Sequence, residues 1–162
     1  KELKSLNTKV EETVNLELDT GAHNKRYFYD VSESIISLAQ RDKSHISLAV
    51  IYVNQVIVQH SSMQTIIHTV ANAISECDIF VKFDKNKFVV LFPETSAEQA
   101  LIVSEKLRKM VYEIHNLDKG HTTITIGVSE FLISSDNINT LLERADNIAK
   151  NSPKNSIQIS LL

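Results

Sequence analysis

The chain has 162 residues, of which 43% are hydrophobic and 23% charged, and this is the size and composition of a single globular domain with a sizeable core. Seventeen basic residues against 20 acidic ones give a net charge of -3, and no run of lysine and arginine forms the footprint of a nucleic-acid-binding protein. One cysteine and three scattered glycines exclude a disulfide framework, a multi-cysteine zinc site and the glycine-rich loops that cradle phosphates.

No apolar run approaches the roughly 20 residues needed to cross a bilayer, and no signal peptide opens the sequence. We therefore expect a soluble, cytoplasmic protein without direct membrane insertion. The sequence starts at Lys1, inside a charged helical pattern and without a methionine. For that reason we expect a segment of a longer protein, with an upstream sensory domain in the same parent chain.

The first predicted element is a helix with a narrow apolar stripe. The members of the stripe recur every three or four residues and are Leu3, Leu6, Val10 and Val14. Two interpretations stay open: the end of a coiled coil that pairs two chains as a homodimer, or a helix packed on its own domain. We expect a signalling linker helix over residues 1–18 and a globular domain over residues 19–162.

Helices and strands alternate through the rest of the chain. The predicted elements are a helix from 28 to 42, a strand at 46–53, a helix at 63–74, two strands at 79–83 and 88–92, a helix from 95 to 114, a strand at 123–128, a helix at 138–149 and an edge strand at 157–161. This order predicts an α+β fold, an α/β sandwich around one mixed sheet.

Several details of these elements follow from local patterns. The strand at 46–53 is almost wholly apolar, which is typical of a strand covered on both faces, whereas alternation at 123–128 predicts one buried face. Residues 84–87 predict a four-residue hairpin loop. Thr95 and Glu98 match a capping box that begins the long helix, and Pro153 prevents the last helix from continuing.

Four strings carry more information than periodicity. They are TGAHNKRYF at 20–28, DIFVKF at 78–83 followed by FVVLFPET at 88–95, TIGV at 125–128 and RADNIAK at 144–150. In this order and at these separations, over residues 17–160, they resemble the GGDEF family, the diguanylate cyclase domain of bacterial signalling proteins. The resemblance implies a nucleotidyl-cyclase-like fold, in which helices flank a central mixed sheet.

The family's G-G-[DE]-E-F signature is replaced in this chain. The corresponding residues are Asp84, Lys85, Asn86, Lys87 and Phe88. In active members of the family the glycines let the turn approach the nucleotide, and turn carboxylates help to hold divalent metals. Lys87 puts an ammonium where a carboxylate belongs, and at about 4 Å this changes the interaction with a divalent ion by several kcal/mol, even at an effective dielectric near 20. We therefore expect a degenerate member with no catalytic residue, metal or cofactor at this turn.

Other family positions also depart from the pattern. The family's first-strand string L-D-x-D-x-F reads IYVNQ at 51–55, so neither acidic position is kept. The chain is too short between Gln55 and Met63 for the family's N-D-x-x-G-H-x-x-G-D segment, which grips the guanine and ribose. The inhibitory product site R-x-x-D begins with Ser75 and ends with Asp78, and a serine lacks the donor fork of arginine, so we expect no product binding there.

Two lysines and the histidines complete the candidate set. Lys150 and Lys154 lie where the family has phosphate-contacting basic residues, which makes them candidates for nucleotide binding, although lysines near a helix end also favour the helix dipole. His60 and His68 lack a third ligand at defined spacing. His115 and His121 flank a turn whose residues are explained by loop chemistry. The apolar context of Cys77 predicts a buried, inert thiol.

These patterns favour a catalytically inactive GGDEF-like signalling domain. It would serve as a protein-interaction or dimerisation module of a larger bacterial sensory protein, with a protein partner that the sequence does not identify. The alternative is an effector domain that senses GTP or cyclic-di-GMP through Lys85, Lys87, Lys150 or Lys154. A third hypothesis is an active diguanylate cyclase with substitute ligands, and it conflicts with the lost signature, first-strand acids and base-binding segment.

Overall fold

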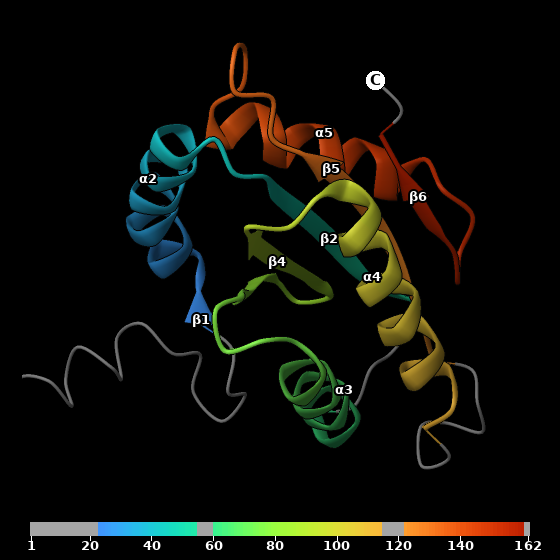
Figure 1. Ribbon diagram of the computed structural model, residues 1–162. Helices are drawn as coiled ribbons and strands as arrows, with labels where there is room; N and C mark the ends of the chain where they lie inside the picture. The colour runs from blue at the N-terminus through green and yellow to red at the C-terminus, as the bar shows by residue number, and fades with distance from the viewer. Residues whose placement is uncertain (1–22, 55–59, 115–121, 161–162) are drawn as a thin grey trace, which may run out of the picture.

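The computed structural model describes residues 23–54, 60–114 and 122–160, which form a six-stranded mixed sheet with helices on both faces (Figure 1). The elements are β1 (His23–Asn24), α2 (Lys25–Asp42), β2 (Ile46–Asn54), α3 (His60–Ala73), β3 (Ile79–Asp84), β4 (Lys87–Pro93), α4 (Ala97–Tyr112), β5 (Thr123–Glu130), α5 (Ile138–Lys150) and β6 (Ile157–Ile159). The predicted α+β sandwich is confirmed.

The sheet has the strand order β1-β3-β4-β2-β5-β6. Strand β2 lies between β4 and β5 and is antiparallel to both, whereas β1 is parallel to β3 and β6 is parallel to β5. Eight residues from Ile46 to Val53 make β2 almost entirely apolar, and nearly all of them are buried because helices cover both faces of the central strands.

Two hydrophobic cores lie on opposite faces of the sheet. Strand β4 supplies both, because its side chains alternate: Phe88, Val90 and Phe92 join the core under α3 and α4, and Val89 and Leu91 join the core under α2 and α5. Figure 1 shows these helix pairs on the two sides of β2 and β4. The β-branched and aromatic side chains of the strands thus form much of both cores, and the helices cover them.

Helix α5 packs directly on the backbone of β5 at Gly127. A Cβ atom at this position would lie 2.3 Å from the carbonyl oxygen of Ala145 and 2.6 Å from the amide nitrogen of Ala149. Only a residue without a side chain permits this approach, and the two alanines keep the facing helix surface thin. The close contact holds the C-terminal end of α5 beside the sheet.

Strand β5 corrects one prediction of the sequence. Alternation predicted one buried face, but the burial of Thr125 and Ser129 as well as Ile126 and Val128 shows that both faces are covered. Helix α4 contacts one face and α5 the other. Small hydroxyl side chains fill the second face, so a polar alternation does not mean an exposed face here.

The start of α4 corrects a second prediction. The N-cap is Ser96, whose Oγ accepts a hydrogen bond from the amide of Gln99 at 3.3 Å, while Gln99 Oε1 accepts from the amide of Ser96 at 2.9 Å. The hydroxyl of Thr95 instead donates to the carbonyl of Pro93 at 2.8 Å. Thr95 with Glu98 and Ser96 with Gln99 both fit the capping-box pattern, and the helix begins with the second pair.

Some predictions concern residues outside those described. They are the apolar stripe of residues 1–18, the boundary at residue 19, the bridge at 55–59, and His115 and His121.

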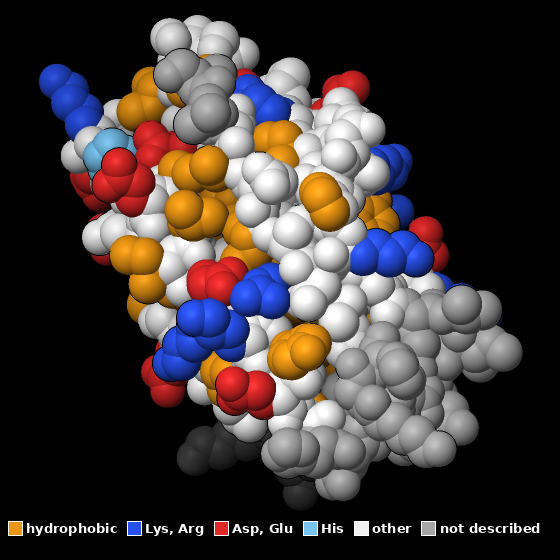
Figure 2. Space-filling model, turned by 90° about the vertical axis from the view of Figure 1, so that its right-hand side faces the viewer, with side chains coloured by type: hydrophobic (Ala, Val, Ile, Leu, Met, Phe, Trp, Pro, Cys, Tyr) orange, Lys and Arg blue, Asp and Glu red, His pale blue; other side chains and the backbone are white. Residues whose placement is uncertain are grey.

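Within the described residues, the helices are too short or too polar to span a bilayer. On the face shown in Figure 2, basic and acidic side chains are interspersed.

Candidate functional site

A cleft of about 740 Å³ lies where the β3–β4 hairpin, the end of β2 and the C-terminal end of α5 meet. The lining residues are Tyr52, Val53, Asn54, Asp84, Lys85, Asn86, Lys87, Thr125, Ala149, Lys150, Ser152 and Lys154. The structure therefore brings residues 84–87 of the replaced signature together with Lys150 and Lys154, whereas Phe88 is buried in the core. Their chemistry defines the candidate site.

The hairpin turn has a shorter loop than the sequence predicted. Asp84 pairs with Lys87 in the ladder, which leaves only Lys85 and Asn86 in the connection. A register shift between Lys82 and Asp84 supplies the extra residue, and neither turn residue has a positive φ, so the turn forms without glycine. The prediction of a four-residue loop was wrong because periodicity does not reveal a bulge.

The turn is fixed by hydrogen bonds to its own residues and to β2. The amide of Val53 donates to the carbonyl of Asn86 at 2.8 Å, and the amide of Lys85 donates to Asp84 Oδ1 at 2.8 Å. These bonds place the side chain of Lys87 beside the end of α5. A charged group on the hairpin can therefore reach a charged group on the helix.

Asp146 on α5 is the centre of a charged cluster in the cleft wall. Lys87 Nζ lies 3.1 Å from its Oδ1, Lys150 Nζ lies 3.1 Å from its Oδ2, and the hydroxyl of Tyr52 donates to Oδ1. The Asp146 side chain is only 14% exposed. One carboxylate thus accepts from two ammonium groups and a phenol, and both of its oxygens are occupied.

The side chain of Lys87 is held on several sides. It is 20% exposed, and its ammonium lies 5.8 Å from the ring centroid of Tyr52 and 5.6 Å from that of Phe83. Cation–π attraction to the two rings adds to the ion pair with Asp146. The ammonium is therefore fixed in place rather than free in solvent.

The pKa values of the cluster favour its charged form. Burial alone would raise the pKa of Asp146, but hydrogen bonds from Tyr52, Lys87 and Lys150 outweigh it and hold that pKa below its usual value. Burial raises the pKa of Tyr52, and the hydrogen bond to Asp146 raises it further. At neutral pH Asp146 is ionised and the phenol keeps its proton.

The rest of the cleft floor is polar but uncharged. Asn54 Nδ2 donates to Thr125 Oγ1 at 2.7 Å and to Thr123 Oγ1 at 3.2 Å, and the amide of Asn155 donates to Thr125 Oγ1 at 3.0 Å. Tyr52 and Asn54 occupy the two positions where the family string L-D-x-D-x-F has aspartates. Neither replacement supplies an anionic oxygen.

These residues do not fit a divalent metal ion. Magnesium takes anionic oxygen ligands, yet both oxygens of Asp146 accept from ammonium or hydroxyl groups, and Asp84 accepts from the turn amide. Lys87 adds a positive charge beside Asp146. In the part of the chain that the structure describes, no group of three or more His, Cys, Asp or Glu side chains could hold a metal.

The residues of the family's product site lie apart from the cleft, in the turn between α3 and β3. The amide of Ser75 donates to Asp78 Oδ2 at 2.8 Å, and the amide of Cys77 donates to Ser75 Oγ at 3.3 Å. Both side chains thus close the turn. Cys77 is exposed, so the prediction of a buried thiol was wrong: the residue precedes the buried part of β3 rather than belonging to it.

The histidines do not form a site among the described residues. His45 Nδ1 lies 3.2 Å from Glu130 Oε2 and its side chain is 65% exposed, while His68 is exposed on α3. His60 begins α3, and its side chain is outside what the structure describes. Among the described residues, no group of three or more His, Cys, Asp or Glu side chains includes a histidine.

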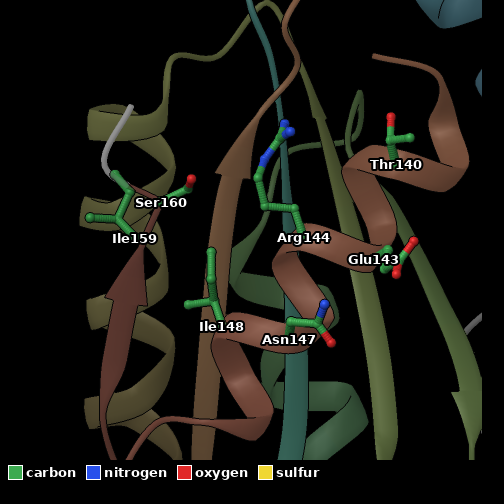
Figure 3. Close-up of a pocket in the computed structure, with 7 residues that line it drawn as sticks. All are labelled: Thr140, Glu143, Arg144, Asn147, Ile148, Ile159 and Ser160. Carbon is green, nitrogen blue, oxygen red and sulfur yellow. The ribbon is translucent and has the colours of Figure 1, made fainter. Parts of the chain in front are cut away.

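A second hollow of about 550 Å³ lies between α5 and β6 (Figure 3). Its charged lining residues are Glu143 and Arg144. Arg144 points along β5, where its Nε donates to Ser129 Oγ at 2.6 Å and its guanidinium binds Asp136 and the carbonyl of Glu130. Arg144 is thus occupied by structural bonds. The hairpin cleft is the better candidate site because it retains ammonium groups at its surface.

Asp146 is the residue of the site that sequence reasoning missed. In the sequence it stands within the helix string RADNIAK, and no local pattern gives it a role of its own. Two signals could have found it: Lys150 lies four residues further along the same helix face, and Lys87 needs an anionic partner once a metal is excluded.

Comparison with known proteins agrees with the fold and the motif strings. The family described as "Diguanylate cyclase, GGDEF domain" matches residues 18–156. Diguanylate cyclase A from Treponema denticola is 30% identical over 103 residues, which cover 59% of this chain and 28% of that protein. The chain therefore spans less than a third of that relative.

Two solved structures share the fold. The coiled coil and GGDEF domain of DgcB from Caulobacter crescentus, in complex with c-di-GMP, has a TM-score of 0.85 at 18% identity and covers 98% of this chain and 92% of that one. Diguanylate cyclase SiaD with its activator SiaC, from Pseudomonas aeruginosa, has a TM-score of 0.81 at 21% identity over 98% of this chain and 66% of that one. These structures share the fold, and the family match over residues 18–156 shows that the chain belongs to the GGDEF domain family.

Proposed function

We propose that this chain is a catalytically inactive GGDEF domain that acts as a protein-interaction or dimerisation module in a larger, cytoplasmic sensory protein of bacteria. The observation that carries the proposal is the cluster at Asp146. Its carboxylate is neutralised by Lys87 and Lys150, and Lys87 stands where the family's signature has a metal-binding acid.

The chemistry of cyclisation supports this conclusion. Joining two GTP molecules requires a ribose hydroxyl to attack a phosphate that divalent metals polarise, and a base that takes the proton. The cleft offers Asp84 and the occupied Asp146 as its carboxylates. Tyr52 is no substitute base, because burial and its bond to Asp146 raise its pKa and keep the phenol protonated.

Two structures with the same fold support the proposed role as an interaction module. DgcB was solved with a coiled coil attached to its GGDEF domain, and SiaD with an activator protein bound to it. By analogy, residues 1–18 would be a linker helix to an upstream sensory domain, and residues 19–162 the domain that receives the signal. The stripe of Leu3, Leu6, Val10 and Val14 would pair two chains.

Incubation with GTP and magnesium tests the catalytic part of the proposal. We expect no cyclic-di-GMP by chromatography with mass detection, because no group in the described cleft holds the metal. Diguanylate cyclase A from Treponema denticola, assayed beside it, is the positive control for the conditions. Product formed at a rate comparable to that control would contradict the proposal.

Sedimentation equilibrium tests the dimerisation part. Replacing Leu6 and Val10 together by lysine should convert dimer to monomer, because two buried charges would face their counterparts across the seam. The matched control, Ser5→Lys with Thr8→Lys, adds the same charge on the opposite side of the predicted helix and should leave the dimer intact. A monomeric parent chain would contradict the pairing.

A further inference from the structure

Strand β6 forms an edge of the sheet with an open outer side. It comes last in the order β1-β3-β4-β2-β5-β6, and among the described residues only β5 pairs with it. Figure 1 shows β6 at the right-hand edge of the sheet, beside α5 and α4. In the part of the chain that the structure describes, this edge has no further strand as a neighbour.

The backbone groups of Ile157 and Ile159 point outward from this edge. The amide of Ser160 donates to the carbonyl of Val128 in β5 at 2.9 Å, and Val128 lies opposite Ile159 in the parallel register. Successive residues of a strand direct their N–H and C=O groups to opposite sides, so Ile157 and Ile159 face away from β5. Their donors and acceptors are available to another extended chain.

Strand β6 lacks several of the features that keep natural edges from pairing. Such edges are often protected by lysine, proline or a bulge, whereas β6 reads Ile-Gln-Ile and keeps a regular register with β5. Its length of three residues limits the number of backbone bonds. Stable binding therefore requires contacts with side chains beside the edge.

Helix α5 supplies such contacts on one face of the sheet. Residues at spacings of three and four make a stripe along the side of α5 that borders the hollow of about 550 Å³, namely Thr140, Glu143, Arg144, Asn147 and Ile148. Figure 3 shows Ile148 on α5 and Ile159 on β6 on two sides of this hollow. Both are half-buried, so an apolar side chain placed between them would remove more of their surface from water.

Helix α4 borders the same edge on the other face. Its Arg108 Nη1 donates to Asn155 Oδ1 at 2.9 Å, just before β6 begins. Glu105 and Leu101 lie one and two turns earlier on the same side of α4, and Leu101 is half-buried. A strand added to β6 would thus lie between two helices and extend the existing sandwich.

Glu143 indicates the charge of the occupant. It is exposed and makes no ion pair within residues 23–54, 60–114 and 122–160, whereas Arg144 is paired with Asp136. A lysine or arginine of a partner would be attracted to Glu143. A second copy paired antiparallel along β6 would instead bring another Glu143 to the same face of the joined sheet, which favours a different protein as the occupant.

We propose that the open edge of β6 binds an extended segment of a partner protein by strand addition. The segment pairs with the backbone of Ile157 and Ile159, places an apolar side chain against Ile148 and brings a basic residue to Glu143. This site rests on the proposed function as an interaction module, and it adds the surface and the kind of partner.

Peptide display on the full chain tests the site, with a library of random short peptides as the probe. We expect selected peptides that alternate β-branched with polar residues and contain lysine or arginine. Glu143→Lys should weaken their binding about tenfold in calorimetry, because attraction becomes repulsion. Glu33→Lys is the matched control, since Glu33 is exposed on α2, which contacts β1 and β3, and its variant should bind as the parent does.

Amide hydrogen exchange followed by NMR locates the contact on the backbone. In the free chain, the amides of Ile157 and Ile159 should exchange faster than those of Gln158 and Ser160, which point toward β5. A bound peptide should slow exchange at Ile157 and Ile159 about tenfold. This measurement needs no substitution, so it does not depend on the folding of a variant.

Several results would overturn the β6 site. They are a selection without binders, equal binding to Glu143→Lys and the parent, and unprotected amides at Ile157 and Ile159 with peptide bound. Protection that rises with protein concentration in the absence of peptide would identify a second copy as the occupant and also overturn it. The assay with GTP is independent: cyclic-di-GMP formation would overturn the inactive domain, whereas peptide-dependent protection would still support the β6 site.

Discussion

Asp146 connects three elements through one side chain, since its carboxylate binds the end of β2, the hairpin and the last turn of its own helix. The sequence shows all the partners, but Tyr52 and Asp146 are 94 positions apart. Local patterns predict helices and strands and do not predict which distant polar groups meet. For this reason Lys87 could be recognised as unsuited to metal from the sequence alone, whereas its partner could not be identified.

Removing the Tyr52 hydroxyl tests this cluster. Tyr52→Phe should lower the free energy of unfolding by about 2 kcal/mol, because Asp146 loses a donor within a half-buried network. Urea unfolding at pH 7 measures the change. Tyr112→Phe is the matched control, since Tyr112 is 54% exposed, and an equal loss in both variants would contradict the role of the cluster.

Asp136 gives the protein an acid-sensitive bond. Burial would raise the pKa of Asp136, but hydrogen bonds from Arg144, the Leu132 amide and Thr140 outweigh it and lower that pKa below 3.8. The folded state then binds fewer protons than the unfolded state. The contribution of the Asp136 carboxylate to the free energy of unfolding is therefore present above the pKa of the unfolded state, 3.8, and is lost as the pH falls through the lower pKa of the folded state.

Asp136→Asn should therefore cost about 3 kcal/mol at pH 7, since Arg144 would be left without its buried charge partner. The difference in free energy of unfolding between the variant and the parent protein should shrink as the pH falls below about 4, because the Asp136 carboxylate of the parent protein is then protonated. Urea unfolding at both pH values measures it. Asp30→Asn, at an exposed position of α2, should cost almost nothing at either pH.

Cys77 offers a direct check of its corrected position. Its thiol should react with Ellman's reagent in the folded protein, because the residue is exposed in the turn before β3. The measurement compares the rate in buffer with that in urea. A thiol that reacts only in urea would restore the buried assignment made from its apolar neighbours.

Individual elements differ in how well their sequences predicted them. The long apolar strand β2 and helix α5 were predicted to within a few residues, since burial on both faces and helical spacing leave clear patterns. Two of the predictions that failed concern one-residue choices. The bulge at Lys82 and Asp84 and the cap at Ser96 instead of Thr95 each shift a boundary without changing the hydrophobic pattern.

The cap of α4 can be tested with neighbouring substitutions. Ser96→Ala should cost about 1 kcal/mol in urea unfolding, because the Gln99 amide loses its acceptor. Thr95→Val keeps the shape of the side chain and removes only a hydroxyl that binds Pro93, so it should cost less. The reverse order would show that Thr95 is the cap.

The contact between α5 and β5 predicts a larger effect. Gly127→Ala places a methyl group 2.3 Å from the Ala145 carbonyl oxygen, and neither backbone can move without disturbing the sheet. We expect a loss of about 3 kcal/mol and a fall of about 10 °C in Tm, followed by circular dichroism. Gln158→Ala on exposed β6 is the control, and an equal Tm for both variants would contradict the close packing.

At the scale of the whole molecule, the order of helices and strands was predictable because each element buries apolar surface with a regular period. Three of the four strings that carry the family resemblance lie in the hairpin, β5 and α5, around one cleft, whereas the described part of the fourth, at 23–28, lies in β1 and α2. The charge balance of that cleft depends on the ion pair between Lys87 and Asp146. This contact forms only in the folded chain, so the sequence did not predict it.

Thermal unfolding provides a test at this scale. Millimolar magnesium should leave Tm unchanged, because a ligand stabilises only a state that binds it, and the cleft offers no free carboxylate set. Differential scanning calorimetry with magnesium or EDTA measures this. A rise of Tm with magnesium concentration would reveal a metal site in the native protein.

The edge strand β1 connects the start of α2 to the neighbouring strand β3. His23 and Asn24 in β1 pair with Val81 and Lys82 in β3, and Asn24 also caps α2 by accepting from the Tyr27 amide at 3.0 Å. A displacement of the chain ahead of His23 would therefore act both on β3, two residues before Asp84, and on the first turn of α2.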